Sequence, residues 1–311
     1  MGSYRARAAL LLTVVLWASA FPAIQVSVAG YGWAGLALFR LAIASAALAI
    51  AAPLVKVRRP AMRDLPLIGV SAVTGMAAYQ LLLGWGELRV PGGTASLIVV
   101  TNPVYSAIIA VLFLGERIGG RQVTGGVIAL GGIAVIAVGQ GGLRFERYAL
   151  VVLAAAVALG TYHAAIKPLL SRYTGLEVTA YATWAGTLLL LPAIPALAHA
   201  WPHAGEQAIV ATVFLGLAPS ALGFAAWGYG VARLPVTVAS GFLYLVPPIA
   251  VLIGYVWLGD KPSLIELIGG AIALAGVAFA IHRPGTATAP ETGITNVVPA
   301  PAPPARAPSA Q

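Results

Sequence analysis

The chain has 311 residues, of which 60% are hydrophobic and only 9% charged, and its net charge is +9. A soluble domain carries about 25% charged residues to cover its surface, so this composition excludes an ordinary water-soluble protein. The chain has no cysteine, which excludes disulfides and thiolate metal sites. Its basic residues are scattered among the connections rather than clustered, so the positive charge does not indicate binding of nucleic acid.

Long apolar runs separated by short polar connections dominate the sequence. Each run has about 20 residues, the length that a helix needs to cross a hydrocarbon core of about 30 Å. Backbone polar groups find no water in that core, so each crossing is expected to be a helix. The pattern predicts an all-α, polytopic membrane protein with spans at 7–28, 33–52, 65–88, 93–114, 122–139, 148–168, 177–198, 208–230, 236–258 and 263–281.

The two ends of the chain need separate interpretation. Arg5 and Arg7 precede an apolar stretch that ends in Ala18-Ser19-Ala20, which imitates a cleavable signal peptide. The apolar stretch continues beyond that point and has a counterpart in the second half of the chain, so we expect it to be retained as a span. Residues 284–311 are rich in proline, alanine and threonine and predict a disordered cytoplasmic tail.

Lysine and arginine in alternate connections predict the orientation in the membrane. With the N-terminus in the cytoplasm, 13 basic residues fall inside and 4 outside, and Arg40 lies within a span. The inner set is Arg5, Arg7, Lys56, Arg58, Arg59, Arg63, Arg117, Arg121, Lys167, Arg172, Arg233, Arg283 and Arg306, and the outer set is Arg89, Arg144, Arg147 and Lys261. The bias predicts that both termini are cytoplasmic.

The two halves of the chain are related in sequence. A shift of 144 residues aligns 92–137 with 236–281, so that Pro103 meets Pro247. Each half holds five predicted spans, and because five is odd, the second copy enters the membrane from the opposite side. Inverted repeats of this kind are typical of secondary transporters, which bind substrate between the halves near the middle of the membrane.

Several stretches of the first half, with their counterparts in the second, carry a family resemblance. They are Trp17-Ala18-Ser19-Ala20-Phe21, Phe39-Arg40-Leu41 and Pro103 with Leu114-Gly115-Glu116-Arg117, matched by Pro247 with Leu258-Gly259-Asp260-Lys261 and Gly269-Gly270. With these stretches the chain resembles the EamA-type half of the drug/metabolite transporter superfamily over about residues 6–283. The resemblance implies two five-helix repeats, at 1–142 and 143–283, around a central cavity, with the fifth and tenth helices set to one side.

The resemblance also implies a function. The family includes bacterial exporters of amino acids and related metabolites, and the chain is most similar to the aromatic and broad-range amino-acid exporters of the inner membrane. We therefore expect a secondary transporter that exports aromatic and other neutral amino acids by alternating access. Export of other small metabolites or of drugs is the alternative. The expected partners are the small-molecule substrate and the lipid bilayer.

Polar and aromatic side chains within spans are the candidates for substrate binding, because exposing polar groups to lipid is costly. His163 ordinarily titrates near neutral pH, so it is either a cavity ligand or proton carrier, or a histidine bonded to a neighbouring helix. Trp17 lies mid-span rather than at an interface, and its span aligns with that of His163, so the two spans are expected to face each other across the cavity. The candidate substrate-binding residues are Trp17, Phe21, Tyr79, Gln80, Asn102, His163 and Tyr244.

Prolines inside spans are candidates for hinges or gates, because proline removes a backbone hydrogen bond and frees the carbonyl four residues earlier. The candidates are Pro22, Pro103 and Pro247, and the alternative is that they are packing kinks. Arg40 lies about two turns from the outer end of its span. We expect it to snorkel or to pair locally, with Glu87 as one partner, and contact with a substrate carboxylate is the alternative.

The distribution of acidic and catalytic groups excludes other classes of function. No Asp or Glu lies deep in a predicted span, which disfavours exchange of protons for organic cations and favours a neutral or zwitterionic solute. One mid-span histidine without cysteine or a deep carboxylate leaves little for an intramembrane enzyme, the remote alternative. The chain has no GxxxxGK[ST] motif. We therefore expect no metal, no cofactor and no ATPase subunit.

Overall fold

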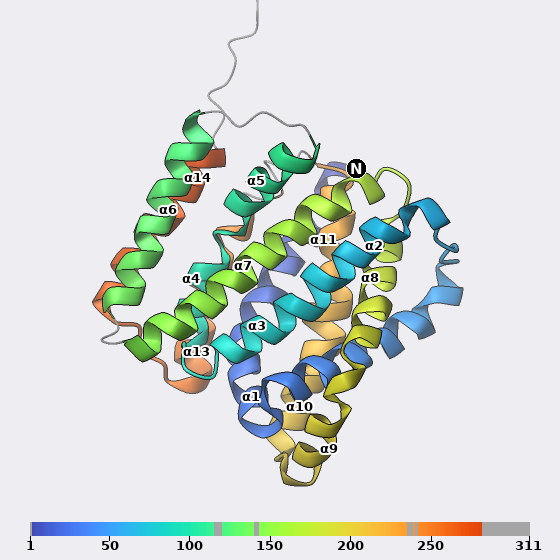
Figure 1. Ribbon diagram of the computed structural model, residues 1–311, viewed down its shortest axis with the longest axis horizontal. Coiled ribbons are helices and arrows are strands. Elements are labelled where there is room, and N and C mark those ends of the chain that lie inside the picture. The colour runs from blue at the N-terminus through green and yellow to red at the C-terminus, as the bar shows by residue number, and fades with distance from the viewer. Residues whose placement is uncertain (1, 115–119, 140–142, 235–238, 240–241, 282–311) are drawn as a thin grey trace, which may run out of the picture. The chain divides into compact units, whose positions relative to one another are not determined.

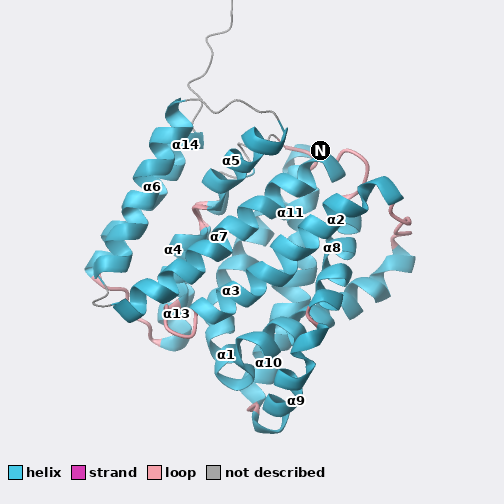
Figure 2. Cartoon of the chain, viewed as in Figure 1, coloured by secondary structure: helices cyan, strands magenta, loops and turns pink. Residues whose placement is uncertain are grey.

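The computed structural model describes residues 2–114, 120–139, 143–234, 239 and 242–281, and these residues form helices without strands (Figures 1 and 2). The predicted tail at 284–311 lies outside this part of the chain. The predicted boundary between the repeats adjoins residues 140–142, which also lie outside it, so both remain predictions.

The helices follow the predicted spans closely. The first half contains α1 (Gly2–Leu54), a 3-10 turn (Met62–Asp64), α2 (Leu65–Ser71), a π-helix (Ala72–Ala78), α3 (Tyr79–Gly86), α4 (Gly92–Val99), α5 (Asn102–Leu114) and α6 (Gly120–Gly139). The second half contains α7 (Leu143–Leu169), α8 (Gly175–Leu189), α9 (Ile194–Ala200), α10 (Glu206–Leu215), a π-helix (Gly216–Gly223), α11 (Phe224–Val231), α13 (Val246–Leu258) and α14 (Leu264–Ile281), with 3-10 turns at Leu191–Ala193 and Trp201–His203.

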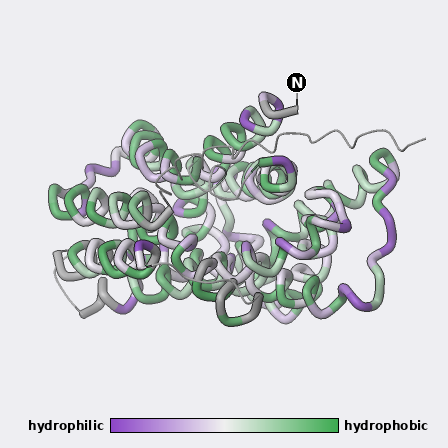
Figure 3. Tube along the Cα trace, turned by 90° about the horizontal axis from the view of Figure 1, so that it is seen from above, coloured by the Kyte–Doolittle hydropathy of each residue, from purple (hydrophilic) through white to green (hydrophobic). Residues whose placement is uncertain are grey.

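Several of these helices are long and apolar enough to cross a membrane. Among the described residues, four qualify by length and composition, or five if a pair that meets at 48° is one span. Figure 3 shows hydrophobic residues along the helices and hydrophilic residues gathered largely in the connections. The prediction of an all-α, polytopic membrane protein is confirmed, and the count of ten spans stays a prediction.

Helix α1 contains the first two predicted spans, which are separated by a sharp turn at Gly32. The backbone there has φ 63° and ψ 171°, a conformation that side chains with a Cβ rarely adopt. Glycine therefore allows one continuous chain to change direction between residues 7–28 and 33–52. This turn lets Trp17 and Arg40, both in α1, reach the same cavity.

The structure repeats the irregularities of the first half in the second. The π-helices begin at Ala72 and Gly216, which are 144 residues apart, and α5 and α13 begin at Asn102 and Val246, also 144 residues apart. Each of the latter two helices has proline as its second residue. Identical offsets in two kinds of helix break show that the repeat extends from the sequence to the backbone.

Helices α6 and α14 pack together at one side of the bundle, as Figure 1 shows. A Cβ at Gly132 would lie closer than 3.0 Å to the backbone of Ala273. A Cβ at Gly276 would lie equally close to the backbone of Ala129, and a shift of 144 residues exchanges these two contacts. Small residues thus bring the two backbones together, which is how helices associate where the solvent is lipid.

Replacing Gly132 by alanine is expected to destabilise the protein by about 1–3 kcal/mol, because one methyl group would overlap the backbone of α14. The neighbouring Gly131 provides a matched control, since nothing lies within 4 Å of the Cβ that alanine would add. Thermal unfolding in detergent should show a lower Tm for Gly132→Ala and an unchanged or slightly higher Tm for Gly131→Ala, because alanine favours the helix where its methyl group meets nothing. Equal Tm values for the two variants would contradict this packing.

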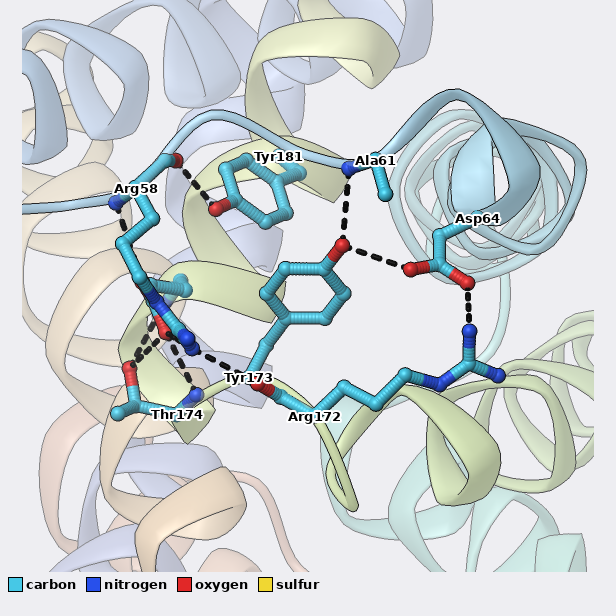
Figure 4. A network of polar contacts seen from close by, with 8 residues as sticks. Arg58, Ala61, Asp64, Arg172, Tyr173, Thr174 and Tyr181 are labelled. Atoms are coloured by element: carbon cyan, nitrogen blue, oxygen red, sulfur yellow. Dashed lines mark hydrogen bonds and ion pairs between the residues drawn. The ribbon is translucent and has the colours of Figure 1, made fainter.

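A polar network joins the two halves at the end of the bundle that carries Arg58 (Figure 4). The Arg58 guanidinium donates to both carboxylate oxygens of Glu177, at 2.8 Å from Nε and 3.0 Å from Nη2. This hydrogen bonding raises the pKa of Arg58. Glu177 also accepts from the backbone N–H of Thr174, whose hydroxyl caps the first turn of α8. The ion pair therefore links the connection before α2 to the start of α8.

The second part of the network lies around Asp64. Its carboxylate forms an ion pair with Arg172 and accepts a hydrogen bond from the Tyr173 hydroxyl at 2.7 Å. The same Tyr173 hydroxyl accepts from the backbone N–H of Ala61 at 2.9 Å. Asp64 is buried, so these partners satisfy a carboxylate that water cannot reach.

Candidate functional site

A small cavity lies between helices of both halves. It has a volume of about 30 Å³, and its wall is mostly apolar. The first half contributes four of the predicted binding residues, and the second half contributes Leu159, Phe224, Leu243 and Val246. The predicted residues on the wall are Trp17, Phe21, Tyr79 and Asn102. A space of this size has room for a few water molecules.

Trp17 is the centre of an aromatic cluster on this wall. Its ring stacks on His163 with centroids 6.3 Å apart and an interplanar angle of 13°. It also contacts Phe224 at 5.0 Å and Trp227 at 5.5 Å. The two spans therefore do face each other, as their places in the aligned halves predict, and they meet at Trp17 and His163. The cluster joins the first half to the second through aromatic faces.

The backbone of the second π-helix holds the Trp17 indole in place. Trp17 Nε1 donates to the carbonyl of Pro219 at 3.3 Å. A Cβ at Gly223 would lie 2.9 Å from the same nitrogen, so glycine is required for this close approach. π-helical segments inside α-helices occur often at functional sites. Here the segment presents a carbonyl to a side chain of the opposite half.

Asn102 lies where the fourth predicted span is broken. Pro103 has no N–H to donate to the carbonyl of Val99, four residues earlier. Asn102 Nδ2 donates to that carbonyl instead, at 2.9 Å, and Asn102 Oδ1 lies 3.0 Å from Nδ1 of His163. One amide thus caps the broken helix and orients the histidine. His163 Nε2 is buried and has no partner among the described residues.

Arg40 reaches the cavity from the second arm of α1 and is only 4% exposed. Its Nε donates to Ser220 Oγ at 2.6 Å. No ion pair within 4.0 Å joins Arg40 to Glu87 in the described structure, although the two side chains interact electrostatically at longer range. Gly216 lets the π-helix approach the Arg40 backbone, because a Cβ there would lie 2.8 Å from the carbonyl. Ser220, one turn further on, then meets the guanidinium.

The other predicted site residues lie around the cavity rather than on its wall. Gln80 is buried, and its Nε2 has no partner among the described residues. Tyr244 is half-buried, and its hydroxyl is likewise unpartnered. Pro22 is buried within α1, while Pro103 and Pro247 open α5 and α13. The structure therefore brings four of the seven binding candidates onto the wall and sets His163 directly behind it.

Two kinds of wall residue were missed or misjudged from the sequence. Arg40 does not snorkel, because the facing π-helix encloses it, and its pairing is with Ser220 of the other half. Phe224 and Leu243 are apolar residues in apolar helices, and no sequence signal separates them from residues that face lipid. None of the residues that form this wall is acidic.

Comparisons with known proteins identify the family. A model of the EamA-like transporter family matches residues 6–138 and 147–281, one match in each half. A protein of Streptantibioticus cattleyicolor, named a probable terminal-alkyne amino-acid exporter, is 57% identical over 275 residues, which cover 88% of this chain and 93% of the relative. The uncharacterized transporter YdfC of Bacillus subtilis is 35% identical over 269 residues, covering 86% of this chain and 88% of the relative.

More distant similarities agree with these. A probable amino-acid metabolite efflux pump of Escherichia coli is 21% identical over 281 residues, covering 86% of this chain and 91% of that protein. One solved crystal structure matches with a TM-score of 0.61 and 22% identity, covering 89% of this chain and 97% of that chain, and it supports the fold alone. The matched family and the named relatives are transporters rather than enzymes. With a family match across both halves, the chain belongs to the EamA-like transporter family, as a membrane transporter built from two EamA repeats.

Proposed function

We propose that this transporter exports amino acids with aromatic or compact apolar side chains across the bacterial inner membrane. The observation that carries the proposal is the composition of the cavity wall. Aromatic rings, one amide and one guanidinium line it, and no acidic side chain does. Such a wall suits a zwitterion with an apolar side chain, because aromatic faces can receive its ammonium and its side chain, whereas the positive charge of Arg40 repels a solute that is only a cation.

The proposed mechanism is alternating access, with both termini in the cytoplasm. The cavity is small and lies between helices of both halves, so in this mechanism the two halves move apart to admit substrate. The breaks at Pro103 and Pro247 begin helices at matched positions and are the proposed hinges, together with Pro22. Hinges are a few residues at element ends that absorb backbone rotation, which fits these places.

The name of the 57% identical relative supports an amino acid as substrate. A terminal alkyne is a narrow, linear, apolar group, so an amino acid that carries one fits the same description of substrate. We therefore include L-propargylglycine, a small terminal-alkyne amino acid, among the proposed substrates, beside L-phenylalanine and L-leucine.

The test is counterflow into liposomes that contain the purified protein. Vesicles preloaded with one unlabelled amino acid should take up the same labelled amino acid in a saturable manner, and protein-free vesicles should not. L-phenylalanine, L-leucine and L-propargylglycine form the positive panel, and L-aspartate, L-lysine and tetraphenylphosphonium form the contrast panel. Counterflow of tetraphenylphosphonium without any amino acid would overturn the proposal.

A further inference from the structure

Arg40 is a buried charge whose hydrogen-bonding capacity is mostly unused. A guanidinium carries five N–H donors. Among the described residues, only Ser220 accepts from it, through Nε. The side chain is 4% exposed and lies on the wall of the cavity. Leaving such a charge buried with a single neutral partner is costly, unless a further partner arrives.

Among the described residues, no carboxylate lies within 4.0 Å of the Arg40 guanidinium, although Glu87 interacts with it electrostatically at longer range. Glu87, at the end of α3, is buried, and neither of its carboxylate oxygens has a hydrogen-bond partner in the described structure. It is nevertheless not within 4.0 Å of the guanidinium, as the described ion pairs show. The cavity wall contains no acidic residue. Arg40 therefore lies on the cavity wall with donors from which no carboxylate of the described residues accepts a hydrogen bond.

We propose that Arg40 binds the carboxylate of the transported amino acid, a proposal that rests on the function proposed above. The planar guanidinium matches a carboxylate through two parallel hydrogen bonds, which a lysine ammonium cannot reproduce. Trp17 and Phe224 lie on the same wall and offer aromatic faces to the side chain of the substrate. The cavity thus separates an anion-binding end from an apolar end.

The Arg40 side chain also connects the two halves of the protein. Arg40 belongs to α1, and Ser220 belongs to the π-helix of the second half. A carboxylate that engages the remaining donors would add contacts at a junction between the halves. Binding of the substrate group and closure of the halves would then stabilise each other.

The experiment compares an acid with its amino alcohol as competitors of L-phenylalanine counterflow. L-phenylalanine carries the carboxylate, and L-phenylalaninol replaces it with a neutral hydroxymethyl group while keeping the ring and the ammonium. For the wild-type protein, the alcohol should compete about 10- to 100-fold more weakly than the acid, as expected for loss of a charge-assisted pair. Equal competition by acid and alcohol in the wild-type protein would overturn the proposal.

Variants of Arg40 test whether this residue causes the difference in competition between the acid and the alcohol. In Arg40→Gln, half-inhibition by the acid should need about 10- to 100-fold more competitor than in the wild-type protein. The half-inhibitory concentrations of the alcohol and the acid should then be nearly equal. Arg40→Lys should show a ratio of these concentrations between those of the wild-type protein and Arg40→Gln. It replaces the glutamine variant in the test if that variant does not fold. Arg89→Gln removes an exposed arginine after α3 and should keep the wild-type ratio. A folded Arg40 variant that keeps the full ratio would also overturn the proposal.

The outcomes separate this proposal from the function on which it rests. If wild-type protein moves no amino acid, the proposed function fails and no competition can be measured. If wild-type protein moves L-phenylalanine but Arg40→Gln and Arg40→Lys keep the discrimination, the function stands and the role of Arg40 is wrong.

Discussion

Trp17→Ala is expected to lower L-phenylalanine counterflow by about 10- to 100-fold. Trp17 contacts His163, Phe224 and Trp227, and each aromatic pair of this kind contributes about 0.5–1.5 kcal/mol. The variant also leaves the carbonyl of Pro219 without its indole donor. Removal of the side chain would therefore open the wall of the cavity and loosen the contact between the halves.

Two further tryptophan variants make this prediction specific. Trp17→Phe keeps an aromatic ring but loses the hydrogen bond to Pro219, so its counterflow should fall less than that of the alanine variant. Trp201→Ala removes a tryptophan that is 50% exposed and does not line the cavity, and it should transport like wild type. Each variant is first checked by size-exclusion chromatography. Unchanged counterflow in folded Trp17→Ala would contradict the placement of substrate in this cavity.

Asn102→Leu is expected to reduce both stability and transport. The variant removes the donor to the Val99 carbonyl and the partner of His163 Nδ1 in a single step. Each buried polar group left unsatisfied costs about 1–3 kcal/mol, so we expect a Tm lower by several degrees and counterflow lower by at least about 10-fold. Thermal unfolding and liposome counterflow measure the two effects on one preparation.

A double-mutant cycle with His163→Leu tests whether the two residues act together. In the His163→Leu background, Asn102→Leu should lower the Tm and the counterflow less than it does in the wild-type protein, because its partner His163 is already absent. Asn102→Asp gives a second comparison, since an ionised carboxylate can accept from His163 but cannot donate to Val99. Additive losses across the cycle would show that the amide and the imidazole are not coupled.

The sequence predicts the fold well because a chain that crosses lipid must satisfy its backbone hydrogen bonds within each span. Apolar runs of span length must be helices, and the predicted spans coincide with helices across the described residues. The turn at Gly32 also falls between the first two predicted spans. The π-helices at Ala72–Ala78 and Gly216–Gly223 could not be predicted, because no local pattern distinguishes them from ordinary helix.

The candidate site was predictable only where residue chemistry is unusual for a membrane interior. Trp17, Asn102 and His163 stood out as polar or aromatic groups in mid-span, and the structure brings these three together. The environment of Arg40 depends on Ser220, which lies 180 residues away in the other half. Such a contact arises from packing between the halves, and single-sequence reasoning has no access to it.

The central claim is that amino acids pass through the cavity between Trp17, Arg40 and Asn102. Photo-crosslinking with L-photoleucine, an apolar amino acid that carries a diazirine, tests this most directly when the labelled peptides are mapped by mass spectrometry. Labelling is expected in peptides that line the cavity, around Phe21, Val99 and Phe224, and excess L-leucine should suppress it. Labelling confined to lipid-facing surfaces such as that of Leu112, with no effect of competitor, would contradict the claim.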